Sequence, residues 1–427
     1  MLGKSIYSAL QDAAKAHARW EYETSVTILR SKKRLALLAV MVLPCLLFSV
    51  AMAVDLPEVI GGHAAYCPSF YTPGIFLASI LIGLVAGLIT GVIGAGGGFI
   101  ITPALMSAGI KGILAVGTDL FHIFAKAIMG TTVHRKLGNV SIGLAIAFVI
   151  GSFIGVSCGG VLNRAIYDFN PILSDLFISL IYVFLLGYLG SYALLDFLRH
   201  RKTTAPSGTP AASVESGSSA GTRPPQKRSM AEKLQSMKIP PQITFDQNLA
   251  PGGRRIPALF VAICGFFVGL VAAIMGVGGG FLTFPMFVYV LGVSSFTTVG
   301  TDILQIIFTA GYASIGQYAV YGFIFYTLAM GMLLGSLLGV QVGAMTTKVV
   351  KGVYIRGFYA MAILAGFANR LFSLPEKLGE MKILSISPTL GSTLSLIGVW
   401  IFFVMIAIFA IWLIIKFIGN LKVLREV

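Results

Sequence analysis

The chain has 427 residues, of which 56% are hydrophobic and only 11% are charged, and its formal net charge is +15. Soluble globular domains have about 25% charged residues, so this composition excludes an ordinary soluble protein. Most of the positive charge lies outside the apolar stretches, at 1–34, 199–256 and 416–427. Basic segments that flank apolar helices mark the cytoplasmic side of a membrane, so we expect no nucleic-acid partner.

Apolar stretches recur along the chain at the length of about 20 residues that a helix needs to cross a bilayer. In chain order they are 35–54, 74–93, 140–162, 175–198, 257–275, 322–345, 352–373 and 394–415. The alternating pattern of barrel strands is missing, so helices must satisfy the backbone within the membrane. We predict an all-α polytopic membrane protein with about eight crossings.

The predicted spans set the domain boundaries. From the N-terminus we expect a basic cytoplasmic tail (1–34), an extra membrane anchor (35–54), a first transmembrane repeat (74–198), a disordered cytoplasmic linker (199–256), a second transmembrane repeat (257–373), a C-terminal transmembrane helix (394–415) and a cytoplasmic tail (416–427). Ala51-Met52-Ala53 resembles a signal-peptide cleavage site, but the long segment ahead of it favours a retained anchor.

The two repeats are visible as internal sequence similarity. The stretch IGLVAGLITGVIGAGGGFIITP from Ile82 matches CGFFVGLVAAIMGVGGGFLTFP from Cys264, and both copies are followed by Gly-Thr-Asp. Further on, Gly151-Ser152 matches Gly335-Ser336. The same motifs in the same order indicate a duplication.

The basic segments also predict the orientation of the repeats. They place both termini and the linker in the cytoplasm. For this to hold, 94–133 and 276–318 must each form a pair of short or re-entrant helices, which leaves three crossings per repeat. An odd number makes the two halves inverted relative to each other, as in many secondary transporters.

Glycines occur in two patterns. The first is a spacing of four, as in Gly83-Gly87, Gly151-Gly155-Gly159 and Gly335-Gly339. Such faces let helices approach closely in lipid. We interpret them as packing surfaces; the alternative is that they line a sliding or permeation surface.

The second pattern is a run of three glycines, 96–98 and 278–280, followed by Pro103 and Pro285. Glycine costs about 1 kcal/mol and proline about 3 kcal/mol in a helix interior, so we predict a helix break in each repeat. The free N–H groups at such a break are suited to holding an anion. The alternative is a purely structural break that allows close packing. Phe99 and Phe281 occupy the position at which a dinucleotide-binding motif needs glycine.

Polar residues follow each glycine run. Thr118-Asp119 and Thr301-Asp302 are matched between the repeats, whereas His122 and Lys126 in the first repeat are replaced by Gln305 and Thr309 in the second. An ionised carboxylate is expensive within a membrane, so each aspartate needs a local reason. Either it caps a short helix, which we favour, or it binds a coupling proton or cation. An intramembrane enzyme with Asp119 and His122 as an acid/base pair is a weaker reading.

The candidate substrate-binding residues are those of the glycine runs and the polar motifs. They are Gly96, Gly97, Gly98, Thr118, Asp119, His122, Gly278, Gly279, Gly280, Thr301, Asp302 and Gln305, with Pro103 and Pro285 as helix-breaking residues. Neither the four scattered cysteines nor the histidines have the spacing of a metal site, so we expect no metal and no cofactor.

The sequence resembles the TauE/SafE sulfite exporter family at these motifs. The resemblance rests on GVIGAGGGFIITP and IMGVGGGFLTFP, each followed by GTD, and on GSFIG and GSLLG further on, and it covers roughly 74–415. It implies an inner-membrane transporter of small sulfur-containing or organic anions such as sulfite, sulfonates or sulfate. The extra N-terminal span and the long linker depart from the family pattern.

The expected partners are therefore a small anion, the lipid bilayer and a coupling proton or cation, while the sequence leaves the oligomeric state open. An inside-negative membrane favours outward movement of an anion by about 2.3 kcal/mol per charge per 100 mV, so export needs no coupling. The alternative function is a non-transporting scaffold or sensor whose linker recruits a cytoplasmic partner.

Overall fold

The structure is a computed structural model that describes residues 73–93, 97–136, 141–203, 230–237, 239–246, 253–346, 349–350 and 352–420. The predicted tail 1–34, the predicted anchor 35–54 and Gly96 lie outside the described residues. The elements in chain order are α3 (Pro73–Ile93), α4 (Gly98–Ser107), α5 (Gly112–Lys136), α6 (Ile142–Phe169), α7 (Pro171–Thr203), α8 (Met230–Ser236), β1 (Gln242–Phe245), β2 (Arg254–Pro257), α9 (Ala258–Met275), α10 (Gly280–Pro285), the π-helix η2 (Met286–Val290), α11 (Ser295–Gly311), the π-helix η3 (Tyr312–Ala319), α12 (Tyr326–Thr346), α13 (Gly352–Glu380) and α14 (Pro388–Gly419).

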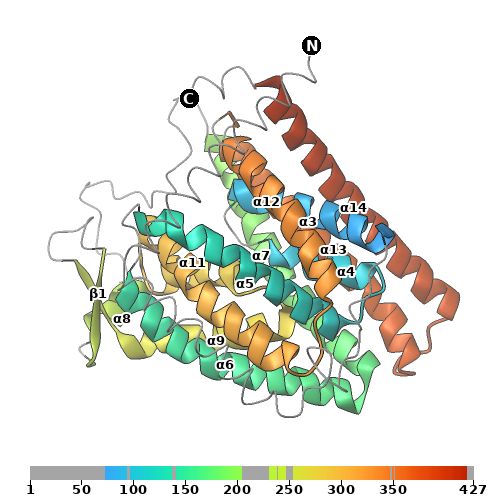
Figure 1. Cartoon of the computed structure of the whole chain (residues 1–427), viewed down its shortest axis with the longest axis horizontal. Helices are drawn as coiled ribbons and strands as arrows, with labels where there is room; N and C mark the ends of the chain where they lie inside the picture. The colour runs from blue at the N-terminus through green and yellow to red at the C-terminus, as the bar shows by residue number, and fades with distance from the viewer. Residues whose placement is uncertain are drawn as a thin grey trace.

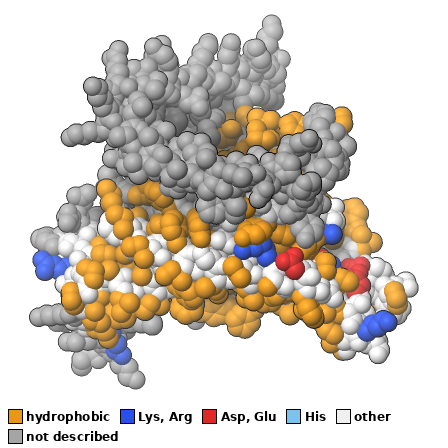
Figure 2. Space-filling view, turned by 60° about the horizontal axis from the view of Figure 1, so that its bottom comes forward, with side chains coloured by type: hydrophobic (Ala, Val, Ile, Leu, Met, Phe, Trp, Pro, Cys, Tyr) orange, Lys and Arg blue, Asp and Glu red, His pale blue; other side chains and the backbone are white. Residues whose placement is uncertain are grey.

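The predicted helical membrane architecture is confirmed in its main features (Figure 1). Among the described residues, six helices are long and apolar enough to cross a membrane: α6, α7, α9, α12, α13 and α14. The predicted span 74–93 is α3, whose apolar part is shorter. Figure 2 shows hydrophobic side chains over most of the described surface in view, with charged groups gathered in a few places.

The two faces of helix α6 differ in the size of their side chains rather than in polarity. Ile142, Ile146, Ile150 and Ile154 are between 57% and 59% exposed, as expected of side chains that meet lipid. Gly151, Gly155 and Gly159 of the same helix are turned toward α9. A Cβ atom added to Gly151 would lie 1.8 Å from the backbone oxygen of Ala262. The two backbones therefore touch directly.

The contact between α6 and α9 is reciprocal. A Cβ atom added to Gly155 would lie 2.0 Å from the backbone oxygen of Phe266, and one added to Gly265 would lie 2.1 Å from that of Phe148. Residue numbers rise together along both helices, so the helices run parallel. The first repeat thus packs its glycine face on the second repeat.

Helices α3 and α12 make the matching contact, also in parallel. A Cβ atom added to Gly83 would lie 2.1 Å from the backbone oxygen of Met332, and one added to Gly335 would lie 1.9 Å from that of Ile80. Close helix packing, the interpretation that we favoured for the four-residue glycine spacing, is confirmed in both pairs.

Helices α7 and α13 pack antiparallel. Gly187 lies against Phe367, whereas Gly357 lies against Phe197, so residue numbers rise along one helix as they fall along the other. Helix α14 covers α13 from the outside, where the ring of Phe358 lies 4.5 Å from that of Trp412, centroid to centroid.

The predicted disordered linker is partly structured, and the prediction is wrong for 230–237, 239–246 and 253–256. Strands β1 and β2 form an antiparallel hairpin in which Ile243 pairs with Ile256. Phe245 and Ile256 are buried in one cluster with Phe148 and Phe287 of the membrane part. These two apolar side chains give the hairpin enough buried surface to fold against the helices.

The predicted pairs of short helices are also corrected. In the first repeat the pair consists of α4, with 10 residues, and α5, with 25 residues. In the second repeat α10 has 6 residues, and α11 continues without interruption into η3. Thr118 and Thr301, which the prediction placed at helix starts, lie inside these second helices.

The backbone contact between α6 and α9 predicts a strong effect of one methyl group. Gly155→Ala places a Cβ against backbone that cannot rotate away, so we expect a loss of about 1–3 kcal/mol or more in the free energy of unfolding. Gly74→Ala is the matched control, because an added Cβ there meets nothing within 4 Å. Thermal unfolding of both variants in detergent measures the difference, and equal stability would contradict the contact.

Candidate functional site

The two glycine runs form the breaks that the sequence predicts, as far as the runs are described. Gly97 precedes α4 with a φ of 69°, and Gly279 precedes α10 with a φ of 84°. Helix α9 ends at Gly276, whose φ is 80°. Residues with a side chain rarely adopt these left-handed angles, so glycine is required where the chain turns out of one helix and into the next.

The two prolines differ in their effect on the helix. Pro103 lies inside α4, so its predicted helix-breaking role is wrong. Pro285 is the last residue of α10, and there the α-helix gives way to the π-helix η2 without a gap. Each lies in the second turn of its helix, where a proline removes a single backbone hydrogen bond, and the helix continues as α-helix in one case and as π-helix in the other.

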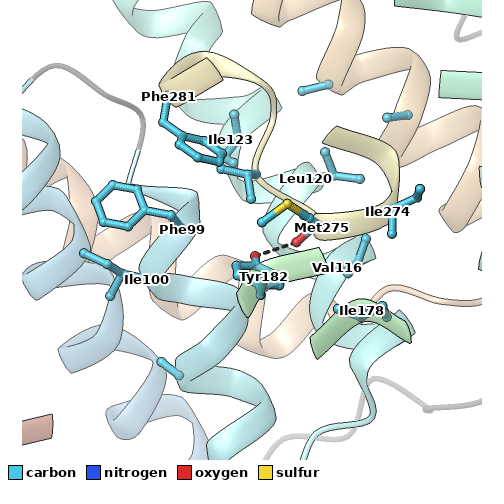
Figure 3. Close-up of a cluster of buried hydrophobic side chains, with 14 of the residues drawn as sticks. Phe99, Ile100, Val116, Leu120, Ile123, Ile178, Tyr182, Ile274, Met275 and Phe281 are labelled. Atoms are coloured by element: carbon cyan, nitrogen blue, oxygen red, sulfur yellow. Dashed lines mark hydrogen bonds between the residues drawn. The ribbon is translucent and has the colours of Figure 1, made fainter. Parts of the chain in front are cut away.

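The breaks of the two repeats pack on each other. A Cβ atom added to Gly98 would lie 2.9 Å from the Cα of Val277. Phe99 and Phe281, the residues after the two runs, have ring centroids 6.0 Å apart (Figure 3). Close approach of the two chain segments thus accounts for a glycine at residue 98. This agrees with the alternative of a structural break that allows close packing. Anion binding at the runs stays a prediction.

Two tyrosines complete the break in the second repeat. The hydroxyl of Tyr182 on α7 donates to the backbone oxygen of Met275 at 2.6 Å (Figure 3). The hydroxyl of Tyr318 on η3 donates to that of Ala273. These carbonyls belong to the last turn of α9, where the helix cannot satisfy them itself. Neither tyrosine stands out in the sequence, because its partner is far away along the chain.

Thr118 and Asp119 do not cap a short helix, contrary to the favoured prediction. Both lie inside α5, which begins at Gly112. The Thr118 hydroxyl donates to the backbone oxygen of Leu114 at 2.6 Å and accepts from the backbone N–H of Phe325 at 2.9 Å. Thr118 therefore provides the hydrogen-bond acceptor for the backbone N–H of Phe325, just before α12. One Asp119 oxygen, Oδ2, accepts from the Thr102 hydroxyl of α4 at 3.0 Å.

The other oxygen of Asp119 faces His122 on the next turn. Asp119 Oδ1 and His122 Nδ1 lie 3.8 Å apart, both side chains are fully buried, and neither atom has a hydrogen-bond partner among the described residues. The second ring nitrogen of His122, Nε2, is hydrogen-bonded to the Ser336 hydroxyl at 2.9 Å. Lys126, one turn further, donates to the Thr90 hydroxyl at 3.3 Å.

The matching cluster of the second repeat is neutral at the position of the histidine. Gln305 donates to Asp302 Oδ1 at 2.8 Å and accepts from the Thr309 hydroxyl at 2.8 Å. Thr309 in turn is hydrogen-bonded to Ser152 at 2.8 Å. Buried polar groups normally find partners, and here they form one connected chain.

Thr301 also departs from the predicted capping role. It lies inside α11, whose N-cap is Ser294, and its hydroxyl accepts from the backbone N–H of Ser141 at 3.0 Å. The structure thus brings Asp302 and Gln305 into one cluster and places Thr301 at a contact with the start of α6.

The comparisons with known proteins bear on both repeats at once. The family model described as "Sulfite exporter TauE/SafE" matches residues 79–369, which include both glycine runs and both Gly-Thr-Asp motifs. The chain belongs to the TauE/SafE family. It is therefore a multi-pass membrane protein of a transporter family, and not an enzyme.

Two relatives of this TauE/SafE protein come from Bacillus subtilis (strain 168). "Probable membrane transporter protein YjnA" is 25% identical over 276 residues, which are 62% of this chain and 87% of that protein. "Probable membrane transporter protein YunE" is 35% identical over 86 residues, which are 20% of this chain and 32% of that protein. No solved structure matches the chain.

One buried charge of this TauE/SafE protein escaped the sequence analysis. Arg370 on α13 is only 3% exposed and donates from Nη2 to the Ser107 hydroxyl of α4 at 2.9 Å and from Nε to Asn369 Oδ1 at 2.7 Å. The signal was present, since Asn369-Arg370 interrupts the predicted apolar span 352–373, and a charge inside a membrane span points to function by default. Among the described residues, no group of three or more His, Cys, Asp or Glu is placed to hold a metal ion.

The Tyr182 hydrogen bond predicts a measurable contribution to stability. Tyr182→Phe leaves the buried carbonyl of Met275 without its donor, which should cost about 1–3 kcal/mol. Tyr188→Phe, on the same helix but 72% exposed, is the control and should leave stability unchanged. Thermal unfolding in detergent compares the two variants; a native-like Tyr182→Phe would show that the carbonyl has another donor.

Proposed function

We propose that this chain is a secondary transporter that moves small sulfur-containing or organic anions, such as sulfite, sulfonates or sulfate, across the inner membrane. The observation that carries the proposal is the contact between two broken helices at the centre of the molecule, beside a buried pair of ionisable groups. Many secondary transporters form their substrate sites from such discontinuous helices. Non-helical backbone at membrane depth is tolerated only where protein buries it or a water-filled cavity receives it.

We further propose that the two repeats are inverted. Helices α7 and α13 hold corresponding positions in the repeats and pack antiparallel, as an inverted pair must. The parallel pairs α3 with α12 and α6 with α9 support the same arrangement, because each joins unlike positions of the two repeats. On the positive-inside rule both termini lie in the cytoplasm, and α4 and α10 enter the membrane part from opposite sides.

The proposed substrate site lies between the N-terminal ends of α4 and α10. These ends begin at Gly98 and Gly280, and the positive end of a helix dipole favours an anion. Gly98 packs against Val277 and Ile123, so the described conformation has the two ends closed on each other. Separation of the breaks would expose the N–H groups of both helices to an anion between them.

The Asp119–His122 pair is the proposed site of a coupling proton. The 3.8 Å between Oδ1 and Nδ1 is longer than a hydrogen bond, and both atoms are buried without a partner among the described residues. When the pair binds a proton, one of the two atoms carries a hydrogen. A small movement of the side chains then lets that atom donate a hydrogen bond to the other. Because Asp119 also holds Thr102 of α4, a change of protonation acts directly on the helix that begins at the break.

Counterflow in proteoliposomes tests the transport proposal. Proteoliposomes that contain the purified protein and are loaded with unlabelled sulfite, a sulfonate or sulfate should exchange it for the labelled anion added outside. Gly279→Val should abolish exchange, because φ is 84° and the added atoms meet Val268. Gly419→Val at the end of α14 is the control, since an added Cβ there meets nothing within 4 Å. Absence of flux for every anion in the native chain would favour the scaffold or sensor reading.

An imposed pH gradient tests the coupling proposal. Acid on the side of the anion should speed flux in the native chain, because the proton moves with the anion and lowers the charge carried across. His122→Gln, which copies Gln305 of the second repeat, should still transport but lose the response to the gradient. Ser392→Ala is the control, because Ser392 is exposed and its hydroxyl bonds only within its own helix α14. A gradient response that survives His122→Gln would contradict the assignment.

A further inference from the structure

We propose that a cavity at the C-terminal end of α4 binds a small oxyanion through Arg370, at a second site separate from the contact between the glycine runs. The inference rests on the proposed function in one respect, since it takes the transported substrate to be an anion. It adds a place where the anion is held before or after it passes the centre.

The cavity has a volume of about 210 Å³ and lies between α4, α7, α13 and α14. One water needs only about 10–15 Å³ on this measure, so a sulfite, sulfate or small sulfonate has room. Polar groups dominate the described lining. They include Ser107, Asp175, Asn369, Arg370, Ser373 and Lys377.

Arg370 is the charge in this cavity that forms no direct ion pair with a described residue, although Asp175 is near enough to attract it. Its hydrogen bonds go to neutral groups, namely the Ser107 hydroxyl, Asn369 Oδ1 and the backbone oxygen of Pro103. No carboxylate of the described residues lies within 4 Å of the guanidinium. A buried charge without an ionic partner is costly, and an oxyanion is the ligand that the flat, forked guanidinium fits best.

The other charged side chains that line the cavity are Asp175, Glu376 and Lys377, so the charges of the described lining balance. Lys377 and Asp175 form an ion pair at 3.4 Å, and Asp175 also accepts from the backbone N–H of Gly112 at 2.7 Å. These two charges therefore offset each other. Glu376 also lines the cavity and is the carboxylate that a bound anion would face. Glu376 should weaken anion binding, so its removal should strengthen it.

A purely structural role for Arg370 would be to fasten α4 to α13. That role requires the hydrogen bonds to Ser107 and Pro103 and involves only Nε and Nη2 of the guanidinium. Nη1 donates to none of the described residues, and so it is the part of the fork that an oxyanion can occupy. The two readings differ in one measurable quantity, which is the preference of the cavity for negative over positive reagents.

Cysteine labelling measures that preference without any need for transport. Ser373→Cys is introduced into a chain whose native cysteines are replaced by serine, and it is treated with methanethiosulfonate reagents that carry either an ethylsulfonate or an ethyltrimethylammonium group. We expect the sulfonate reagent to react about tenfold faster than the trimethylammonium reagent. Added sulfate should slow the reaction of the sulfonate reagent. Ser392→Cys, on the exposed start of α14, is the control and should show neither effect.

Substitutions at the charges complete the test. Arg370→Gln should remove both the preference and the protection by sulfate, and Glu376→Gln, which does not touch the α4 contact, should increase protection at a given sulfate concentration. Equal rates for the two reagents at Ser373→Cys with Arg370 intact would overturn the proposal, as would an absence of protection by sulfate. A chain that shows protection but no flux keeps this site and loses the proposed function; flux without protection does the reverse.

Discussion

Direct backbone contact between helices of different repeats is the interaction on which the rest of the structure depends. In a bilayer, an apolar side chain gains little when it exchanges lipid for a protein contact. Helices therefore associate through close packing and hydrogen bonds. Gly83 and Gly335 allow it between α3 and α12, and Gly155 and Gly265 allow it between α6 and α9. These pairs place Ser336 beside His122 and Ser152 beside Thr309, so the glycine faces also position the polar clusters.

The two similar halves of the sequence place different chemistry at matching positions. Both repeats have a broken helix, an aspartate on the following long helix and a serine from the opposite repeat. In the first repeat the group next to the aspartate is a histidine with an unpartnered ring nitrogen, whereas in the second it is a glutamine with both ends bonded. A fully bonded amide holds its neighbours in one arrangement, while an ionisable pair at 3.8 Å has two. On the proposed coupling, the first half responds to a proton while the second keeps one arrangement.

Periodic and repeated features could be predicted from the sequence, and features that depend on distant partners could not. The glycine spacing and the break at Gly97 and Gly279 follow from backbone sterics, which are local. The prediction of a cap at Thr118 is wrong because its hydroxyl accepts from the backbone N–H of Phe325, which lies 207 residues away along the chain. The hairpin was missed because the residues that hold it, such as Phe245, Ile256 and Arg254, have their partners far away along the chain. Arg370 could have been found from its charge alone, but its partner Ser107 could not.

The exchange of glycine faces between the repeats has a consequence for how the chain is made. A nascent chain enters the membrane from its N-terminus, so α3 and α6 are inserted before α9 and α12 have been synthesised. Until then the glycine faces of the first half have no backbone to meet, and lipid or an insertion factor must cover them. The two halves cannot mature one after the other as independent domains usually do. The synthesis of α12, with only α13 and α14 still to follow among the described helices, completes a helix pair that began with α3.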